Sequence, residues 1–554
     1  MHLLVAFVCI AAHCLTHGSQ AAILVPRNGV RPKHLISDDE LYRVPEDLLI
    51  GAGLSSSQSE GAWKTDGKSE SVMDYLVHIK NSSFPDVLDV AADHYNKYAE
   101  DLALAKELKF TTHRFSISWS RIFPDGNSSN PRTSGVEFYR KYIQEILKNG
   151  MEPMVTMYHF DHPLVVETET KGWTNEKMVE KFVEYANFLF SSYGSMVKYW
   201  NPVNEGNMYC IYLLPLLNAS GLSRTDASSY YKCIHNTVLA QVRVHKLYKE
   251  KYYNPEQDGK VGTSVLVWPS TPATDSYEDA LAATTFNDFF GGIMVHPVVF
   301  GDYPSSVRHL VDKQSREMNM TTSRLPSFHG EDKLYIEKGP ATDFVALNVY
   351  SGFKLQYTRN YTDYGFRPFM IEPSIEDMPF VRVNGIRSDY DENVIKDGLL
   401  WAWNTYQQPI IITESGLFDR NGVHDSRREA YHSLVLRSLI RTMNEYEIPV
   451  ISYHAWSLID VFEFSGGYTG RPYGLIHVDY ANKTLKRTLK DSSRFFIKMA
   501  TDKIVPYIAP PSADTTSTST SVPSTTPSAT SRSASMSYLA MICALSILFK
   551  HPVV

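Results

Sequence analysis

Between about residue 47 and residue 509, short apolar runs of β-type composition alternate with longer amphipathic stretches, and this alternation most constrains the fold. The eight runs are DLLIGAGLSS (from 47), HRFSISW (113), PMVTMYHF (153), VKYWNPVN (197), KVGTSVLVW (260), DFVALNVYS (343), PIIITES (409) and PVISYHAWSL (449). Intervening segments such as EDLALAKELK and HSLVLRSLIRTM have helical spacing. Eight strand–helix units predict an α/β protein with a closed (β/α)8 TIM barrel over residues 47–509.

A doubly wound open sheet is the main alternative architecture. Such sheets carry a Gly-rich phosphate-binding turn after an early strand, and GAGLSSSQ (51–58) does not match that pattern. No repeat of 20 to 50 residues is visible, which argues against solenoids and propellers. The barrel is therefore the preferred interpretation.

Polar side chains gather where the predicted strands end. In a (β/α)8 barrel, the carboxyl ends of the strands line the active site. The residues at or near these positions are Gln58, Arg114, His159, Asp161, Asn204, Glu205, Asn348, Tyr350, Glu414, Trp456 and Glu463. We expect them to meet in one pocket.

Glu205 and Glu414 stand out among these residues, because each follows a buried run, WNPVN and IIIT. A single glutamate is usually a surface acid or a helix cap. Two that face each other across a pocket provide the acid and the second carboxylate that glycoside hydrolysis requires. A separation of about 5 to 5.5 Å predicts retention of configuration, and about 6.5 to 9.5 Å predicts inversion.

The remaining polar strand ends suit a sugar, whose hydroxyls need donors and acceptors and whose ring face needs an aromatic platform. We expect hydroxyl contacts from Gln58, His159, Asn204, Asn348 and Glu463, with Trp456 stacking on the ring. Arg114 and Tyr350 are suited to orient the nucleophile by charge and hydrogen bond. Each such residue taken alone could instead be a satisfied core group.

No metal or cofactor is expected, because the sequence has neither an HExxH motif nor paired CxxC motifs. The formal net charge of −7 and the pI near 6.3 also leave no broad basic surface for a nucleic-acid partner.

Several segments, in order, resemble glycoside hydrolase family 1, the β-glucosidase family. They are SSSQSEGAW (55–63), DHYNKYAEDLALAKELKFTTHRFSISWSRIFP (93–124), YHFDHP (158–163), NPVNEG (201–206), LNVY (347–350), ITESG (412–416), AWSLIDVFEF (455–464) and GGYTGRPYGLIHVDY (466–480). The resemblance covers about residues 48–499. It implies that Glu205 is the acid/base and Glu414 the nucleophile, supported by Arg114 and Tyr350.

The same resemblance places Asn204 near the 2-hydroxyl of the reacting sugar. It assigns Gln58, His159 and Glu463 to the other hydroxyls of the glycone, which is the sugar that is cleaved off. Trp456 would lie beneath its ring.

The chain departs from the family pattern at four positions. Phe160 and Phe464 each replace a Trp, Gly206 replaces a Pro, and Ser415 replaces an Asn. Phe464, which we also place in the substrate site, lacks the indole N–H that could donate to a glycone hydroxyl. The loop near Tyr473 also has one residue more than usual. We expect an altered sugar preference.

The amino-terminal residues, before the predicted barrel, differ from it in composition. Residues 1–19 contain a short apolar run without acidic residues, followed by small residues, which predicts a secretory signal peptide. A buried N-terminal strand is the alternative. Residues 20–46 are interpreted as a connector.

The carboxyl terminus changes composition at Pro510. Residues 510–537 consist largely of Ser, Thr, Pro and Ala, which predicts an unfolded stalk. Residues 538–554 form an apolar tail that is too short to span a bilayer as a helix. The tail resembles a glycosylphosphatidylinositol (GPI) signal, with a plain membrane-associated or cleaved tail as the alternative.

Secretion also agrees with the N-x-Ser/Thr sequons and the cysteines. The sequons begin at Asn81, Asn127, Asn218, Asn319, Asn360 and Asn482. Outside the two termini, the cysteines are Cys210 and Cys233, which are either a disulfide or two separate buried thiols. The resemblance to the family, whose animal members have a disulfide at these positions, implies that Cys210 and Cys233 are bonded to each other.

These features predict a secreted or surface-anchored retaining β-glycosidase that acts on terminal β-D-glucosides or related glycosides and oligosaccharides by double displacement. A thioglucosidase that cleaves S-linked glucosides is the first alternative. The second, from another class, is a catalytically silent carbohydrate-binding or receptor-like protein. A phosphoglycosidase is the least expected, because Gly470 lies near where a phosphate-binding Lys would be needed.

Overall fold

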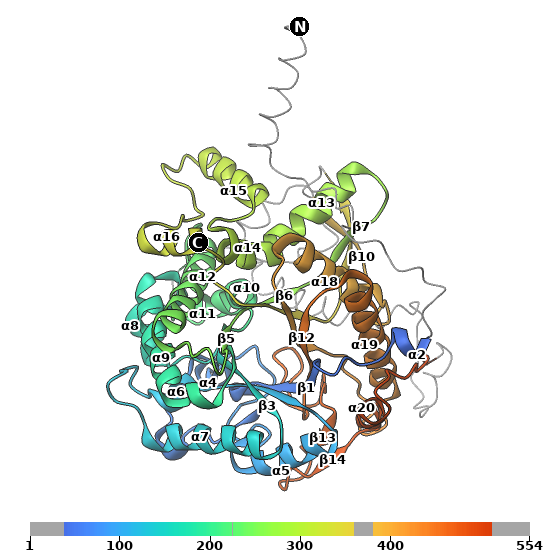
Figure 1. Ribbon diagram of the computed structural model, residues 1–554. Helices are drawn as coiled ribbons and strands as arrows, with labels where there is room; N and C mark the ends of the chain where they lie inside the picture. The colour runs from blue at the N-terminus through green and yellow to red at the C-terminus, as the bar shows by residue number, and fades with distance from the viewer. Residues whose placement is uncertain (1–37, 224, 359–380, 512–554) are drawn as a thin grey trace, which may run out of the picture. The chain divides into compact units, whose positions relative to one another are not determined.

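Parallel strands form a barrel in the computed structural model, which describes residues 38–223, 225–358 and 381–511 (Figure 1). The barrel strands are β1 (Leu49–Leu54), β2 (Thr112–Ser116), β3 (Glu152–Tyr158), β4 (Tyr199–Val203), β5 (Lys260–Val261), β6 (Thr263–Val267), β8 (Val345–Val349), β11 (Ile410–Ser415) and β12 (Val450–Trp456). Each overlaps one of the eight predicted runs, and the fifth run supplies both β5 and β6. The predicted TIM barrel is confirmed.

The fifth strand closes the barrel although it is interrupted. The sheet runs in the order β5-β4-β3-β2-β1-β12-β11-β8-β6, so its two edges are the consecutive segments β5 and β6. Only Gly262 separates them. A Cβ at Gly262 would lie 2.1 Å from the ring of Phe344, so the close approach of these two segments requires glycine here.

Helices surround the strands (Figure 1). Those that follow the successive barrel strands and cover them are α5 (His94–Glu107), α7 (Thr133–Lys148), α9 (Glu176–Tyr193), α12 (Ser229–Leu247), α14 (Ile293–Phe300), α18 (Asn393–Tyr406), α19 (Ser426–Tyr446) and α20 (Asp491–Asp502). In α9 the buried residues recur at helical spacing, for example Met178, Phe182, Tyr185 and Leu189. This helix therefore buries one apolar face against the sheet.

Other helices lie in the connections. They are α2 (Asp38–Leu41), α3 (Ser56–Ser59), α4 (Val72–His78), α6 (Trp119–Ile122), α8 (Leu164–Thr170), α10 (Gly206–Met208), α11 (Leu214–Ala219), α13 (Tyr277–Asn287), α15 (Ser305–Glu317) and α16 (Gly330–Glu337). Within the described ranges, three turns are 3₁₀-helical, η2 (Thr65–Gly67), η3 (Gly172–Thr174) and η4 (Gly194–Met196). Three are π-helical, η5 (Tyr209–Leu213), η6 (Tyr248–Tyr252) and η7 (Asp288–Gly292).

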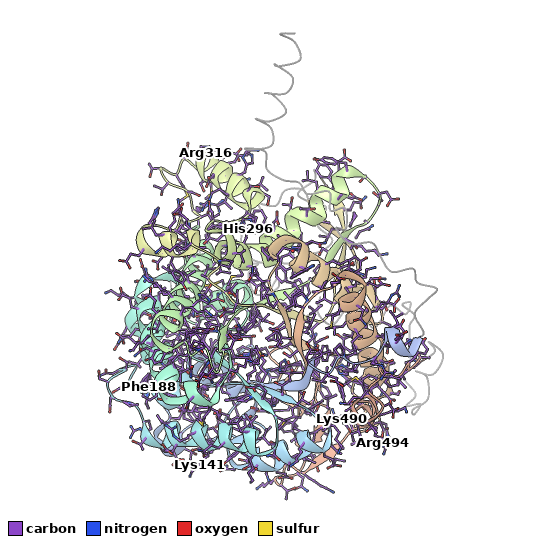
Figure 2. The ribbon with its side chains drawn as sticks, viewed as in Figure 1. Lys141, Phe188, His296, Arg316, Lys490 and Arg494 are labelled. Carbon is purple, nitrogen blue, oxygen red and sulfur yellow. A yellow bond between two sulfur atoms is a disulfide. The ribbon has the colours of Figure 1, made fainter. Side chains whose placement is uncertain are left out.

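Side chains fill the space that the strands enclose (Figure 2). A small apolar cluster of Met154, Phe344, Ala346 and Ile411 is separate from the main core. Three of its members lie two residues before Thr156, Asn348 and Thr413, so the same inward faces become polar one layer closer to the carboxyl ends. The barrel is therefore apolar at its base and polar near its mouth.

Two smaller sheets were not predicted. One contains β7 (Ser270–Pro272), β9 (Phe353–Tyr357) and β10 (Val381–Ile386), and the other pairs β13 (Ile476–Val478) with β14 (Arg487–Leu489). Both belong to segments that follow barrel strands. Three of these strands, β7, β13 and β14, have only three residues each, which is too few for a recognisable period.

The chain just before residue 47 packs against the end of the last helix, where Arg43 forms an isolated bridge with Ile504. Within the described ranges, no helix is both long and apolar enough to cross a membrane. The predicted signal peptide and apolar tail, and nearly all of the stalk, lie outside those ranges.

Candidate active site

Glu414 lies on β11 with both carboxylate oxygens engaged. Nη1 of Arg114, on β2, donates to Oε1 at 2.5 Å, and the hydroxyl of Tyr350, just after β8, donates to Oε2 at 2.7 Å. The glutamate is only 4% exposed, and Arg114 is fully buried. Two donors, one of them charged, therefore hold this carboxylate in one orientation.

Glu205 lies at the turn between β4 and α10. Its backbone has φ 42° and ψ 56°, a left-handed conformation that few non-glycine residues adopt. Nδ2 of Asn348 donates to its Oε1 at 2.5 Å. Burial, together with the nearby charge of Glu414, raises the pKa of Glu205 to about 8. Glu205 therefore keeps its proton at neutral pH.

Two amide side chains connect the glutamates. Nη2 of Arg114 donates to Oδ1 of Asn204 at 2.7 Å, and Nδ2 of Asn348 lies 3.2 Å from the same oxygen. A continuous chain of contacts thus runs from Glu414 through Arg114, Asn204 and Asn348 to Glu205. The structure brings both predicted catalytic residues and both predicted nucleophile supports into one network.

His159 and Trp456 form a second wall beside this network. Nδ2 of Asn204 lies 3.3 Å from Nε2 of His159, whose ring lies 6.0 Å from that of Trp456 at an angle of 18°. Burial and the charge of Arg114 hold the pKa of His159 well below its usual range, so the ring is neutral. In the described part of the chain, Nδ1 of His159 has no hydrogen-bond partner.

Glu463 and Gln58 lie on the same wall. Nε1 of Trp456 donates to Oε1 of Glu463 at 2.9 Å, and burial raises the pKa of Glu463 to about 8. The amide of Gln58 donates to the carbonyl of Phe462 at 2.7 Å and accepts from Ser55 at 2.6 Å. An amide has two N–H groups and two lone pairs, so one donor and one acceptor position remain for a ligand.

Phe464 lies in an aromatic cluster rather than a polar one. Its ring centroid is 6.0 Å from that of Phe160, 6.1 Å from Phe462 and 6.4 Å from Phe84. Two of the departures from the family pattern, at 160 and 464, are therefore in contact. They make this corner of the site apolar.

Two threonines at this site were not predicted from the sequence. Oγ1 of Thr156 accepts from Nε of Arg114 at 3.1 Å, and Oγ1 of Thr413 donates to Oδ1 of Asn348 at 2.6 Å. Both are fully buried and orient the residues that contact the glutamates. Their inward position on β3 and β11 follows from the two-residue strand period, which could have identified them.

Cys210 and Cys233 form a disulfide, with an S–S distance of 2.00 Å and a Cα–Cα distance of 5.8 Å. Cys210 belongs to η5, which begins four residues after Glu205, and Cys233 belongs to α12. The predicted disulfide is confirmed. It ties the segment that carries Glu205 to a long outer helix.

The arrangement can perform acid/base and nucleophilic chemistry on one bound molecule. It supplies a carboxylate held by a cation, a buried carboxyl that carries a proton, and hydrogen-bonding groups around them. No group of His, Cys, Asp and Glu in the described ranges is arranged to hold a metal ion.

The comparisons with known proteins agree with this chemistry. The model of glycosyl hydrolase family 1 matches residues 41–504. Myrosinase 1 of Brevicoryne brassicae is 34% identical over 82% of this chain and 98% of its own length. Among solved structures, aphid myrosinase superposes with a TM-score of 0.75 at 31% identity, over 83% of this chain and 99% of its own.

A rice β-glucosidase mutant, solved in a covalent complex with glucose, gives a TM-score of 0.73 at 28% identity, over 82% of this chain and 98% of its own. The family match thus spans the whole barrel, including both glutamates. From this match, we conclude that the chain belongs to glycosyl hydrolase family 1, as a retaining β-glycosidase.

Proposed function

We propose that the enzyme hydrolyses terminal β-D-glucosides or related β-glycosides, with Glu414 as the nucleophile and Glu205 as the acid/base. The observation that carries this assignment is the difference between their partners. Glu414 accepts hydrogen bonds from Arg114 and Tyr350, whereas Glu205 accepts one from an amide and has a pKa raised to about 8. A nucleophile must be ionised, and an acid must carry a proton.

In the first step, a carboxylate oxygen of Glu414 forms a bond to the anomeric carbon while the bond to the glycosidic oxygen breaks. Glu205 transfers its proton to that oxygen, and the aglycone leaves as an alcohol or phenol. The positive charge that develops on the sugar ring lies near the anionic Glu414. The enzyme then holds a covalent glycosyl ester.

In the second step, the ionised Glu205 takes a proton from water as the water oxygen attacks the anomeric carbon. The ester bond breaks, and Glu414 regains its charge. Two displacements at one carbon restore the β configuration. Glu205 ends the cycle protonated, so no other reactant is needed.

The sugar hydroxyls would contact His159, Gln58, Asn204, Asn348 and Glu463, with Trp456 against the ring. Free hydrogen-bonding capacity supports this role, notably Nδ1 of His159. The apolar corner formed by Phe160 and Phe464 offers no donor to a hydroxyl. We therefore expect a preference among sugars that differs from that of a Trp-containing relative.

A thioglucosidase is the second candidate, and the myrosinase relatives favour it. The same nucleophile can form the glycosyl ester from an S-linked glucoside. A thiolate leaves more readily than an alkoxide, so this step depends less on Glu205 as an acid. Cleavage of an S-glycoside therefore separates the two candidates.

We also propose that the protein is secreted and reaches the cell surface. The buried disulfide is typical of an oxidising compartment. Asn81, Asn127, Asn218, Asn319 and Asn482 are all exposed, as glycan acceptors must be. Asn360 and the carboxyl-terminal tail lie outside the described residues, so attachment by a lipid anchor rests on the sequence alone.

Release of nitrophenol from a panel of nitrophenyl β-D-glycosides tests this function, with the S-glucoside sinigrin included. We expect turnover by the wild type and none by Glu414→Gln. Cleavage of sinigrin at a comparable rate would select the thioglucosidase. A folded wild type without turnover of any substrate would overturn the proposal and favour a silent binding protein.

A further inference from the structure

Gly206 directly follows the acid/base Glu205 and opens α10, at a position where the resembling family has proline. The residue is buried, and other side chains occupy the space beside its Cα. A Cβ built there would lie 2.6 Å from Cε of Met294 and 3.0 Å from Oγ1 of Thr237. The volume that a side chain at 206 would fill is therefore already taken.

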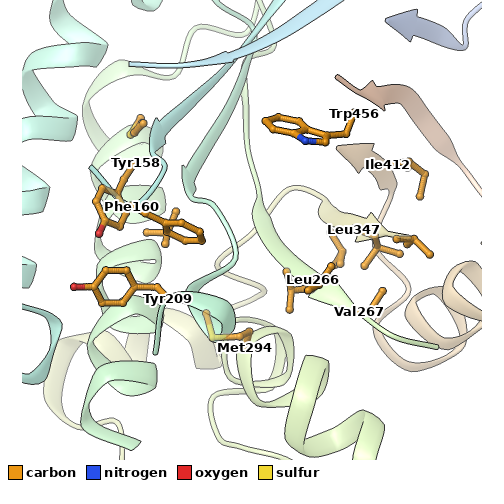
Figure 3. Close-up of a cluster of buried hydrophobic side chains, with 14 of the residues drawn as sticks. Tyr158, Phe160, Tyr209, Leu266, Val267, Met294, Leu347, Ile412 and Trp456 are labelled. Atoms are coloured by element: carbon orange, nitrogen blue, oxygen red, sulfur yellow. The ribbon is translucent and has the colours of Figure 1, made fainter. Parts of the chain in front are cut away.

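Met294 lies in the first turn of α14 and is fully buried. It belongs to the hydrophobic cluster drawn in Figure 3, together with Tyr209 of η5 and Leu266 of β6. Its thioether end points at the backbone of Gly206, because Cε is the atom nearest to the missing side chain. Methionine fills irregular gaps of this kind well.

Other contacts anchor the residues that follow Gly206. Nδ2 of Asn207 donates to the carbonyls of Leu266 and Phe290, both at 3.0 Å, and Cys210 is bonded to Cys233. These anchors hold residues 207 and 210. The contact at Gly206 is the one adjacent to Glu205 itself, whose left-handed backbone conformation needs support from its surroundings.

We propose that Met294 is a positioning residue for Glu205. This inference rests on the proposed function. The Cε methyl of Met294 occupies the space beside Gly206 and thereby sets where the Glu205 carboxyl lies relative to the leaving oxygen. Proline at 206 would fix the backbone and glycine does not, so packing by Met294 supplies the local rigidity in this chain.

Leaving groups of different acidity reveal a misplaced acid. A phenyl or alkyl β-D-glucoside needs protonation of its leaving oxygen, whereas a 2,4-dinitrophenyl glucoside loses a stable anion without it. A displaced Glu205 therefore slows the first kind of substrate and spares the second. A merely destabilised enzyme would lose activity on both alike.

The test compares kcat/KM of Met294→Ala with that of the wild-type full chain on phenyl and 2,4-dinitrophenyl β-D-glucosides. We expect kcat/KM for the phenyl glucoside to fall on the order of tenfold, because small displacements of a catalytic group are costly. The value for the dinitrophenyl glucoside should stay within about twofold. Met294→Leu, which conserves volume, should restore the phenyl value.

Met499→Ala is the matched control, because Met499 is also buried but lies on α20. It should leave the ratio between the two substrates unchanged. If Met294→Ala does not fold, Gly206→Ala tests the same contact from the other side, and it should shift the ratio in the same direction.

An unchanged ratio in Met294→Ala, or in Gly206→Ala if that variant is used, would overturn the inference. Glu205→Gln distinguishes this failure from failure of the proposed function. If Glu205→Gln itself shows no dependence on the leaving group, the acid/base assignment is wrong. If it does show the dependence and the Met294 variant does not, only the positioning role is lost.

Discussion

Glu414 and Glu205 belong to two sides of one barrel mouth that differ in charge, although both residues are nearly buried. Glu414, on β11, receives hydrogen bonds from the guanidinium of Arg114 on β2 and from the hydroxyl of Tyr350 just after β8. Glu205, just after β4, receives a hydrogen bond from the neutral amide of Asn348 on β8, and burial raises its pKa to about 8. Two residues of the same type thus have different roles because their surroundings differ.

The largest expected effect comes from removing the carboxylate of Glu414. Glu414→Gln keeps the size of the side chain but cannot form the glycosyl ester, so kcat should fall by at least about 10⁴-fold. Initial rates with a nitrophenyl β-D-glucoside measure this. Glu317→Gln, an exposed change on α15, is the control and should match the wild type. Substantial turnover by Glu414→Gln would mean that another group is the nucleophile.

The next effect comes from Glu205 and depends on the substrate. Glu205→Gln should lower kcat/KM for a phenyl glucoside by roughly 10² to 10⁴-fold, which is the usual contribution of a general acid. The loss for a dinitrophenyl glucoside should be much smaller. Equal losses on both substrates would contradict the assignment of Glu205 as the proton donor.

A smaller effect should follow from the amide partner of Glu205. The hydrogen bond from Asn348 lowers the pKa of Glu205, so its removal in Asn348→Ala should raise that pKa above the wild-type value of about 8. The reaction needs the protonated acid, so kcat/KM of the wild type should decline as the pH rises through about 8. In the variant, this decline should move to higher pH. A full pH profile measures it, and a shift to lower pH would contradict this reasoning.

The smallest expected effect concerns the apolar corner. Phe464→Trp restores an N–H donor, and one hydrogen bond is worth about 0.5 to 1.5 kcal/mol. The ratio of kcat/KM between a β-glucoside and a β-galactoside should change by roughly two- to tenfold. Phe464→Leu has no donor and serves as the control. If both variants change the ratio equally, packing rather than hydrogen bonding sets the preference.

The sequence predicted the barrel well because its strands are buried on both faces and read as continuous apolar runs. The break at Gly262 was not predictable, since it depends on the ring of Phe344 far along the chain. The polar strand ends identified the side chains that meet at the mouth. Their partners Thr156 and Thr413 were missed, because threonine is common in any strand.

Contacts between distant segments limit what the sequence can show. Gly206 is recognisable as a departure from the family pattern, but its neighbour Met294 lies on α14, three strands later in the chain. The roles of the two glutamates came from the resemblance. Their different hydrogen-bond partners became visible only in the structure.

Trapping the covalent intermediate tests the central claim most directly. A 2,4-dinitrophenyl 2-deoxy-2-fluoro-β-D-glucoside should glycosylate the nucleophile quickly, with release of dinitrophenolate, and the resulting glycosyl ester should hydrolyse slowly. The labelled peptide can then be identified by mass spectrometry after digestion. We predict a single label on Glu414, within the peptide that contains IIITESG. A label on Glu205, or release of dinitrophenol without any covalent label, would contradict the assignment.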